Sequence, residues 1–196
     1  MDLTNYKEVT ALLERHGFRF SKSLGQNFLT AAWVPRRIAE EALIAPGDGV
    51  LEVGPGVGCL TVELAEKAER VLALELDERL RGVLSETLSE HPNVSVVFAD
   101  AVKADLRSLC GEYFGGRPVR VCANLPYNVT SPLLTAFLKA GCFESVTVMV
   151  QKEVPPGFAP GRAPPSTAPS RCLCSGTRKR KSCSTSRQTA SCPVLR

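Results

Sequence analysis

Four short segments of this sequence carry side chains that suit a small-molecule site. The first runs Glu52-Val53-Gly54-Pro55-Gly56-Val57-Gly58, and its alternating glycines let the backbone turn tightly and approach a ligand. The spacing differs from the G-x-G-x-x-G with which dinucleotide enzymes hold a pyrophosphate, and Glu52 would repel a phosphate. The segment therefore favours a ligand with a cationic or uncharged group at this point, such as an amino acid moiety. The alternative is an ordinary tight turn.

Two acidic residues mark the next two segments. Glu75 lies 21 positions after Gly54 (75 − 54), an offset at which a carboxylate accepts both hydroxyls of a ribose. Asp100, followed by Ala101, ends a later apolar run, and its carboxylate suits the exocyclic amine of an adenine. A surface carboxylate and a helix cap are the alternatives at these two positions.

The fourth segment is Asn124-Leu125-Pro126-Tyr127. Asn124 offers a carboxamide acceptor, Pro126 stiffens the turn and Tyr127 offers an aromatic face. Together they suit a planar ring that bears an amine. A turn of this composition also arises by chance, but it is informative when it shares a sheet edge with the other three segments.

An alternation of short apolar runs and helix-length amphipathic stretches positions these segments. Each segment lies at the end of an apolar run, and such runs are typical of buried parallel strands. The order predicts an α/β fold with an open, doubly wound parallel sheet, whose ligands lie at the carboxyl ends of the strands. We expect strands at residues 50–53, 71–76, 94–99, 119–123 and 145–150, helices at residues 4–16, 33–43, 61–70, 77–90 and 131–140, and an ordered loop at residues 21–29.

Three separated motifs, in this order, closely resemble the KsgA/RsmA family of S-adenosylmethionine-dependent ribosomal RNA adenine dimethyltransferases. They are Ser23-Leu24-Gly25-Gln26-Asn27-Phe28-Leu29, the E-x-G-x-G-x-G turn and residues 124–127. The resemblance covers about residues 1–153 and implies the Rossmann-like fold of class I methyltransferases, continued in the family by two further strands and a small helical domain. With the residues singled out above, the expected S-adenosylmethionine site comprises Gln26, Asn27, Leu29, Glu52, Gly54, Gly56, Glu75, Asp100, Ala101 and Asn124.

The resemblance also implies a reaction. Hydrogen bonds from the adenine C6 amine to the Asn124 side chain and the Leu125 carbonyl would draw the nitrogen toward sp³ geometry. Pro126 would shape the turn, and Tyr127 would stack on the extruded base. The expected function is methyl transfer to N6 of adenines in small-subunit (16S-type) ribosomal RNA, giving N6,N6-dimethyladenosine in ribosome biogenesis.

Two other functions remain open on the same fold. One is an Erm-type 23S rRNA adenine methyltransferase, and the other is a non-catalytic rRNA-binding or transcription factor. The Leu24-Gly25 pair and residues 127–132 are closer to KsgA than to Erm. The intact turn at residues 124–127 argues against the non-catalytic alternative.

Composition narrows the class of protein further. The chain is 44% hydrophobic, enough for a core, and no apolar run approaches the roughly 20 residues that span a bilayer. No signal sequence opens the chain, so we expect a cytoplasmic monomer that acts on the small ribosomal subunit and not at a membrane. The eight cysteines and two histidines form no C-x-x-C pair or ligand-like cluster, so we expect neither a metal site nor a disulfide framework.

The last 43 residues differ from the rest. Residues 1–153 hold 16 basic and 20 acidic side chains, whereas residues 154–196 hold 8 basic, none acidic and seven of the 14 prolines. We expect an incomplete methyltransferase domain at 1–153 and a disordered tail at 154–196. A basic nucleic-acid or nuclear-targeting patch at residues 178–181 is the alternative for part of this tail.

The tail also has the character of an out-of-frame translation. Codons permitted for residues 179–193, read from the third base of each, encode Ala-Glu-Val-Leu-Leu-Asp-Ile-Pro-Ser-Asp-Ser-Phe-Met-Pro. That peptide resembles the family's next strand and loop. The strand at 145–150 would then be an exposed apolar edge. We therefore expect the chain as written to be poorly soluble, with little or no activity.

Overall fold

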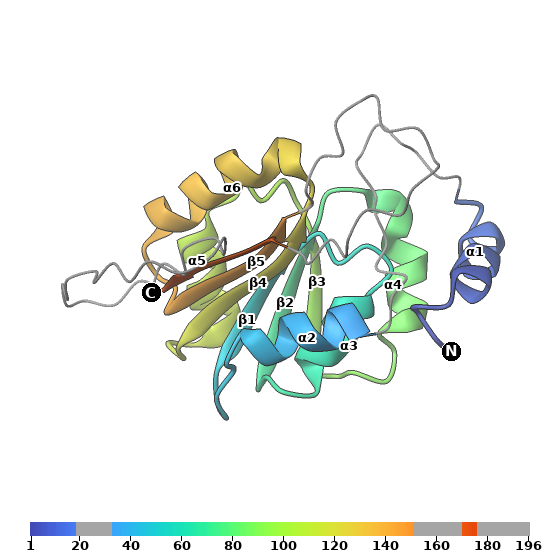
Figure 1. Ribbon diagram of the computed structural model, residues 1–196, viewed down its shortest axis with the longest axis horizontal. Helices are drawn as coiled ribbons and strands as arrows, with labels where there is room; N and C mark the ends of the chain where they lie inside the picture. Colours follow the sequence, from blue (N-terminus) through green and yellow to red (C-terminus); the bar gives the residue numbers. More distant parts are fainter. Residues whose placement is uncertain (19–32, 151–169, 176–196) are drawn as a thin grey trace, which may run out of the picture.

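The apolar runs form one sheet, and the amphipathic stretches cover both of its faces (Figure 1). The computed structural model describes residues 1–18, 33–150 and 170–175. The strands are β1 (Gly49–Val53), β2 (Arg70–Glu75), β3 (Val94–Phe98), β4 (Val119–Leu125), β5 (Ser145–Val150) and β6 (Ser170–Ser175). The helices are α1 (Tyr6–Arg15), α2 (Trp33–Glu41), α3 (Cys59–Ala65), the 3-10 turn η2 (Glu78–Leu80), α4 (Arg81–Thr87), α5 (Leu106–Phe114) and α6 (Tyr127–Ala140).

The strand order is β3-β2-β1-β4-β5-β6. The first five strands pair in parallel, with β1 between β2 and β4. The winding reverses after β3, because the chain returns past β2 and β1 to place β4 on the other side of β1. The predicted doubly wound parallel sheet is therefore confirmed, and the switch point at which such sheets bind ligands lies between β1 and β4.

Helices on both faces bury most residues of the central strands. Leu51 of β1 packs in the cluster formed with α5 and α6, whereas Val50 packs with α2 and α3 on the opposite face. All five residues of β1 are buried, which explains why this strand is continuously apolar except at Glu52. No helix in the described part of the chain is long and apolar enough to cross a membrane.

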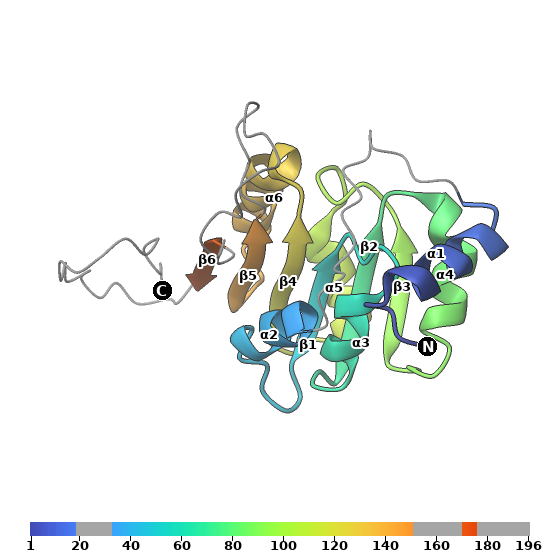
Figure 2. The same cartoon turned by 45° about the vertical axis from the view of Figure 1, so that its right-hand side comes forward.

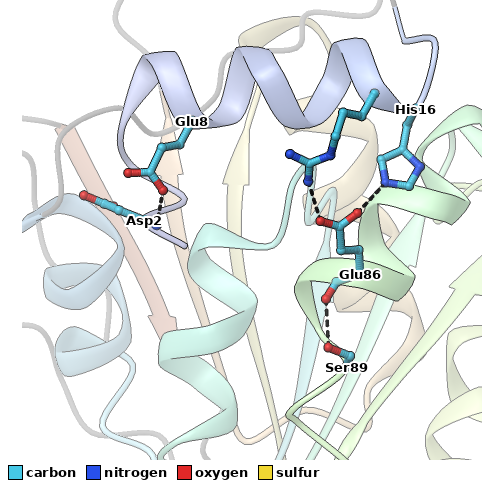
Figure 3. Close-up of polar contacts among 6 residues, drawn as sticks. Asp2, Glu8, His16, Glu86 and Ser89 are labelled. Carbon is cyan, nitrogen blue, oxygen red and sulfur yellow. Dashed lines mark hydrogen bonds and ion pairs between the residues drawn. The ribbon is translucent and has the colours of Figure 1, made fainter.

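Helix α1 packs against α4 at one end of the molecule (Figures 2 and 3). Its buried side chains Val9, Leu12 and Leu13 join a cluster with residues of η2 and α4. At the end of α1, His16 Nε2 lies 2.7 Å from Glu86 Oε2, and Arg15 forms an ion pair with the same carboxylate. The predicted helix at residues 4–16 is thus held to the domain by its apolar face and by the polar contacts of Arg15 and His16 with Glu86.

Helix α5 is absent from the sequence-based expectation, although its signals are present. The Asp105 side chain accepts the Ser108 N–H at 3.0 Å, and Gly115 ends the helix with φ 59°. Leu106, Cys110 and Phe114, spaced four residues apart, are its buried face. Leu109 and Tyr113, which lie between them, pack against the same core cluster, so the five residues have the i, i+3, i+4, i+7, i+8 spacing of an amphipathic helix that the expectation overlooked.

Three helices differ from their expected bounds by more than two residues, and one of them is α3, which ends at Ala65 rather than at residue 70. Helix α6 begins at Tyr127 rather than Ser131, so Pro132 lies inside the helix and not in its first turn as expected. Its end is as expected, because Gly141 has φ 58° and its N–H reaches the Phe137 carbonyl. The expected helix at 77–90 is divided into η2 and α4, and Asp77 caps it as predicted by accepting the Arg79 N–H at 3.1 Å.

The predicted exposed edge at β5 is wrong. Strand β6 pairs antiparallel with the whole of β5, from Ser145 opposite Ser175 to Val150 opposite Ser170 (Figure 2). The parallel part of the sheet has the five predicted strands, and β6 adds an antiparallel strand at residues 170–175, within the segment that was expected to be disordered. A free strand edge presents a row of N–H and C=O groups, and a proline-free run such as Ser170–Ser175 satisfies them whatever its side chains are.

Candidate active site

A cavity of about 200 Å³ lies at the carboxyl ends of β1, β2 and β4, at the switch point of the sheet. A single water needs only about 10–15 Å³ by the same measure, so the cavity has room for an organic ligand. Glu52, Glu75 and Asn124 reach it from one face, because Glu52 is in register with Ala73 and Cys122 and the other two lie two residues further along. Nine of the predicted site residues line it: Glu52, Gly54, Gly56, Glu75, Asp100, Ala101, Asn124, Leu125 and Pro126.

The turn between β1 and α3 needs glycine at three positions because of its backbone conformation. Gly54, Gly56 and Gly58 have φ of 72°, 62° and 94°, values that other L-residues rarely adopt. A Cβ at Gly54 would meet no atom within 4 Å, so the constraint there is the left-handed conformation rather than space. The Gly54 N–H donates to the Leu74 carbonyl at 2.9 Å, which fixes the start of the turn against β2.

Glu75 ties this turn to the end of β2. Its Oε2 accepts the Gly56 N–H at 3.2 Å, and its Oε1 accepts the Asp77 N–H at 2.9 Å. The side chain is buried, and burial raises the pKa of Glu75 even though these N–H groups oppose the shift. The carboxylate is therefore held in one orientation at the cavity wall.

Asp100 closes a turn rather than capping a helix, and it also lines the cavity. Its Oδ1 accepts the Val102 N–H at 2.9 Å, which closes the turn after β3, and its Oδ2 lies 3.2 Å from Lys103 Nζ. The Val102 N–H, followed by the Lys103 side chain, lowers the pKa of Asp100. The residue lines the cavity beside the buried Ala101, so its role in the turn does not exclude ligand contact.

Two buried acceptors in this cavity have no hydrogen-bond partner among the described residues. They are Glu52 Oε2 and Asn124 Oδ1. Buried polar atoms are almost always paired, so unpaired ones that line a cavity indicate a ligand that brings donors. The ammonium of an amino acid and the amine of an adenine are such donors, and the residues present therefore fit S-adenosylmethionine and an adenine acceptor.

The turn at residues 124–127 joins β4 directly to α6. Leu125 is buried and ends β4, and Pro126 has φ −62° and ψ 144° at the position before the helix. Tyr127 is the first residue of α6. The predicted cofactor-binding residues Gln26, Asn27 and Leu29 lie outside the described residues.

Some lining residues were not predicted to contact a ligand. Leu76 lines the cavity next to Glu75 although it is 62% exposed, and an exposed leucine at a pocket offers an apolar contact. In the sequence it is the last residue of an apolar run, so it is indistinguishable from a strand residue. Asn128 and Val129 line the cavity from α6, whose early start was missed.

Comparisons with known proteins agree with this geometry. A model of the ribosomal RNA adenine dimethylase family matches residues 17–156. Ribosomal RNA small subunit methyltransferase A of Ligilactobacillus salivarius is 46% identical over 155 residues, which are 78% of this chain and 52% of that protein. The protein of the same name from Alkaliphilus oremlandii is 45% identical over 153 residues, 78% of this chain and 53% of that protein. The chain thus spans about half the length of the curated relatives it matches.

Solved structures give the same result. The 23S rRNA methyltransferase ErmE is 39% identical with a TM-score of 0.57, over 64% of this chain and 48% of that chain. A dimethyladenosine transferase from Plasmodium falciparum is 28% identical with a TM-score of 0.51, over 61% of this chain and 42% of that chain. Since the family model matches residues 17–156, which are most of the sequence, the chain belongs to the ribosomal RNA adenine dimethylase family.

Proposed function

We propose that the site in residues 1–153 serves methyl transfer from S-adenosylmethionine to N6 of adenines in small-subunit ribosomal RNA, with full turnover expected once the alternative reading frame is restored after residue 153. The observation that carries the proposal is the convergence of two unpaired buried acceptors, Glu52 Oε2 and Asn124 Oδ1, on one cavity at the switch point. The names of the relatives, which are small-subunit methyltransferases, support the choice of RNA. The protein acts as a cytoplasmic monomer in this proposal.

The cofactor side of the cavity is formed by the first half of the sheet. Glu75, already oriented by two N–H groups, accepts the ribose hydroxyls, and Asp100 accepts the adenine amine. Glu52 accepts the ammonium of the amino acid part. S-adenosylmethionine, when bound, supplies an electrophilic methyl group on a sulfonium. By resemblance, Gln26, Asn27 and Leu29 complete the pocket, and Gly54, Gly56 and Ala101 line it.

The acceptor side is the turn at residues 124–127. Asn124 Oδ1 and the Leu125 carbonyl each accept one N–H of the adenine C6 amine, which directs the nitrogen lone pair into the cavity. Orientation of this kind supplies most of the acceleration, and the displaced amine proton passes to water without a strong base. Pro126 fixes the turn, and a stacking role for Tyr127 on the extruded base rests on the resemblance.

Asn124→Ala tests the acceptor role. We expect methyl transfer from tritium-labelled S-adenosylmethionine to undermethylated small subunits to be abolished, because one of the two amine acceptors is removed. Cofactor binding, measured by calorimetry, should be weakened but detectable. Lys139→Ala, near the end of the following helix α6, is the control, and turnover near wild type in Asn124→Ala would contradict the assigned role. The assay uses both the 196-residue chain and a form with the alternative reading frame restored after residue 153.

The structural likeness to the 23S rRNA methyltransferase ErmE favours one alternative substrate. The same assay with purified large subunits separates the two, because methyl transfer to large subunits alone would replace the small-subunit proposal. Cofactor binding without transfer to either subunit would instead favour the non-catalytic alternative.

A further inference from the structure

Glu52 is a buried carboxyl group that the fold leaves without a donor. It lies in register with Ala73 of β2 and Cys122 of β4, which are both buried and small. Its side chain lines the cavity, is 1% exposed, and its Oε2 has no hydrogen-bond partner in the described part of the chain. A carboxylate in this position has lost its water without gaining a cationic partner.

The charged and titratable groups that face Glu52 do not stabilise the negative charge of its carboxylate. Glu75 of β2 is acidic, and the neighbouring thiols are Cys59 of α3 and Cys122 of β4. Burial raises the pKa of Cys59 to about 12 and that of Cys122 well above its ordinary value, so both thiols are neutral. No cation among the described residues shifts Glu52.

Burial therefore decides the protonation of this carboxyl group. It raises the pKa of Glu52 to about 8, helped by the charge of Glu75 and opposed only by the Thr61 hydroxyl. Glu75 differs, because two backbone N–H groups already stabilise its charged form. At neutral pH the ligand-free protein holds its extra proton on Glu52.

We infer that Glu52 releases this proton when the α-ammonium group of the cofactor binds beside it. The inference rests on the proposed function, which places the amino acid part of S-adenosylmethionine at β1. The neutral carboxyl group becomes a carboxylate paired with the ammonium, and the proton passes to the buffer. Cofactor affinity is then coupled to pH through a group that takes no part in methyl transfer.

Calorimetric titration of the full chain measures this coupling directly. Binding heats at pH 6.5 in buffers of different ionisation enthalpy give the number of protons released, which we expect to be close to one. S-adenosylhomocysteine should release the same number, because it keeps the ammonium and lacks only the sulfonium charge. The Kd of each ligand should fall about tenfold between pH 6 and pH 7, a range below the usual pKa of an α-amino group.

Two variants assign the proton to its residue. Glu52→Gln, which is neutral and of the same shape, should bind without proton release and with a Kd that is unchanged from pH 6 to pH 7. Glu66→Gln, exposed just after α3, should behave as wild type. Wild-type binding without proton release, release that survives in Glu52→Gln, or release with S-adenosylmethionine alone would each overturn the inference. Failure of the wild type to bind either ligand would instead overturn the proposed cofactor pocket.

Discussion

Two glutamates of one cavity show how much a residue's role depends on its donors. Glu75 and Glu52 both lie on buried strands, yet Glu75 accepts two backbone N–H groups and Glu52 Oε2 accepts none. Glu75 is thereby already oriented as a carboxylate, whereas Glu52 is suited to receive a donor from a ligand. In the proposed function, the same residue type thus orients a turn at Glu75 and recognises a charged group at Glu52.

The left-handed glycine turn gives a prediction at this scale. Gly54→Ala should destabilise the protein by about 1–2 kcal/mol, because an L-residue at φ 72° is strained even where its Cβ has space. Urea unfolding checks the value, and cofactor affinity should fall with it. Gly111→Ala is the matched control. That glycine lies inside α5 with no atom within 4 Å of its Cβ, so the change should stabilise by about 0.5–1 kcal/mol.

The site was largely predictable because parallel strands bring their carboxyl ends to one edge. Glu52, Glu75, Asp100 and Asn124 each end an apolar run, and all four line the cavity. The unpaired state of Glu52 was not predictable, since it depends on which donors the neighbouring elements bring close. Leu76 was missed because an apolar residue at a strand end carries no sign of its exposure. At the level of elements, α5 was predictable from the helical period of its apolar residues but was overlooked, whereas β6 was not predictable because its pairing depends on backbone groups.

At the scale of elements, α1 is held to α4 by groups that are largely exposed (Figure 3). We expect Glu86→Gln to increase amide hydrogen exchange across α1, because Arg15 and His16 both lose their anionic partner. Exposed Glu90→Gln should leave the exchange of α1 unchanged. Protection of α1 equal to wild type in Glu86→Gln would show that the apolar face of α1 is sufficient.

The stability that the Glu86 contacts give to α1 should depend on pH in a definite direction. The hydrogen bond from His16, together with Arg15, lowers the pKa of Glu86 in the folded protein. A lowered carboxyl pKa means that the contribution is present above the unfolded value and is lost as pH falls through the folded value. Protection of α1 should therefore decline in acid, below the ordinary titration range of glutamate.

A second ion pair, between Arg120 and Asp48, links β4 to the loop before β1. Arg120 of β4 bonds the buried Asp48 carboxylate and also reaches Ser145 Oγ on β5 at 3.2 Å. Arg120→Met should destabilise the protein by about 3 kcal/mol, because it leaves a buried charge without its partner. Exposed Arg117→Met should cost less than about 0.5 kcal/mol.

Acid should reduce the difference in the free energy of unfolding between wild type and Arg120→Met. Burial alone would raise the pKa of Asp48, but the Arg120 side chain and the Ala45 N–H together lower it. The contribution of the pair is thus present above the unfolded pKa of about 3.9 and is lost as pH falls through the lower folded value. Urea unfolding at pH 7 and pH 3 measures it, and an equal difference at both values would contradict the assignment.

At the scale of the whole molecule, residues 154–196 differ from the domain in charge and composition. We propose that they are read out of frame, and that β6 occupies the edge of β5 through backbone pairing alone. A one-base correction near codon 154 should increase soluble yield and methyl transfer, both measured beside the uncorrected gene. A shifted frame that lacks the Ala-Glu-Val-Leu-Leu-Asp-Ile-Pro peptide would refute the proposal.

The reversal of winding between β3 and β4 divides the cavity by chain segment. Apart from the loop at residues 26–29 and Asn124, which is shared, the residues proposed to hold the methyl source lie between residues 52 and 101, and the turn that presents the target amine comes from residues 124–127. Exchange of residues 124–127 alone should therefore change which nucleobase is modified. The residues before 102 should still bind the methyl source. The two parts of the proposed site thus come from separate chain segments, which meet at the neighbouring strands β1 and β4.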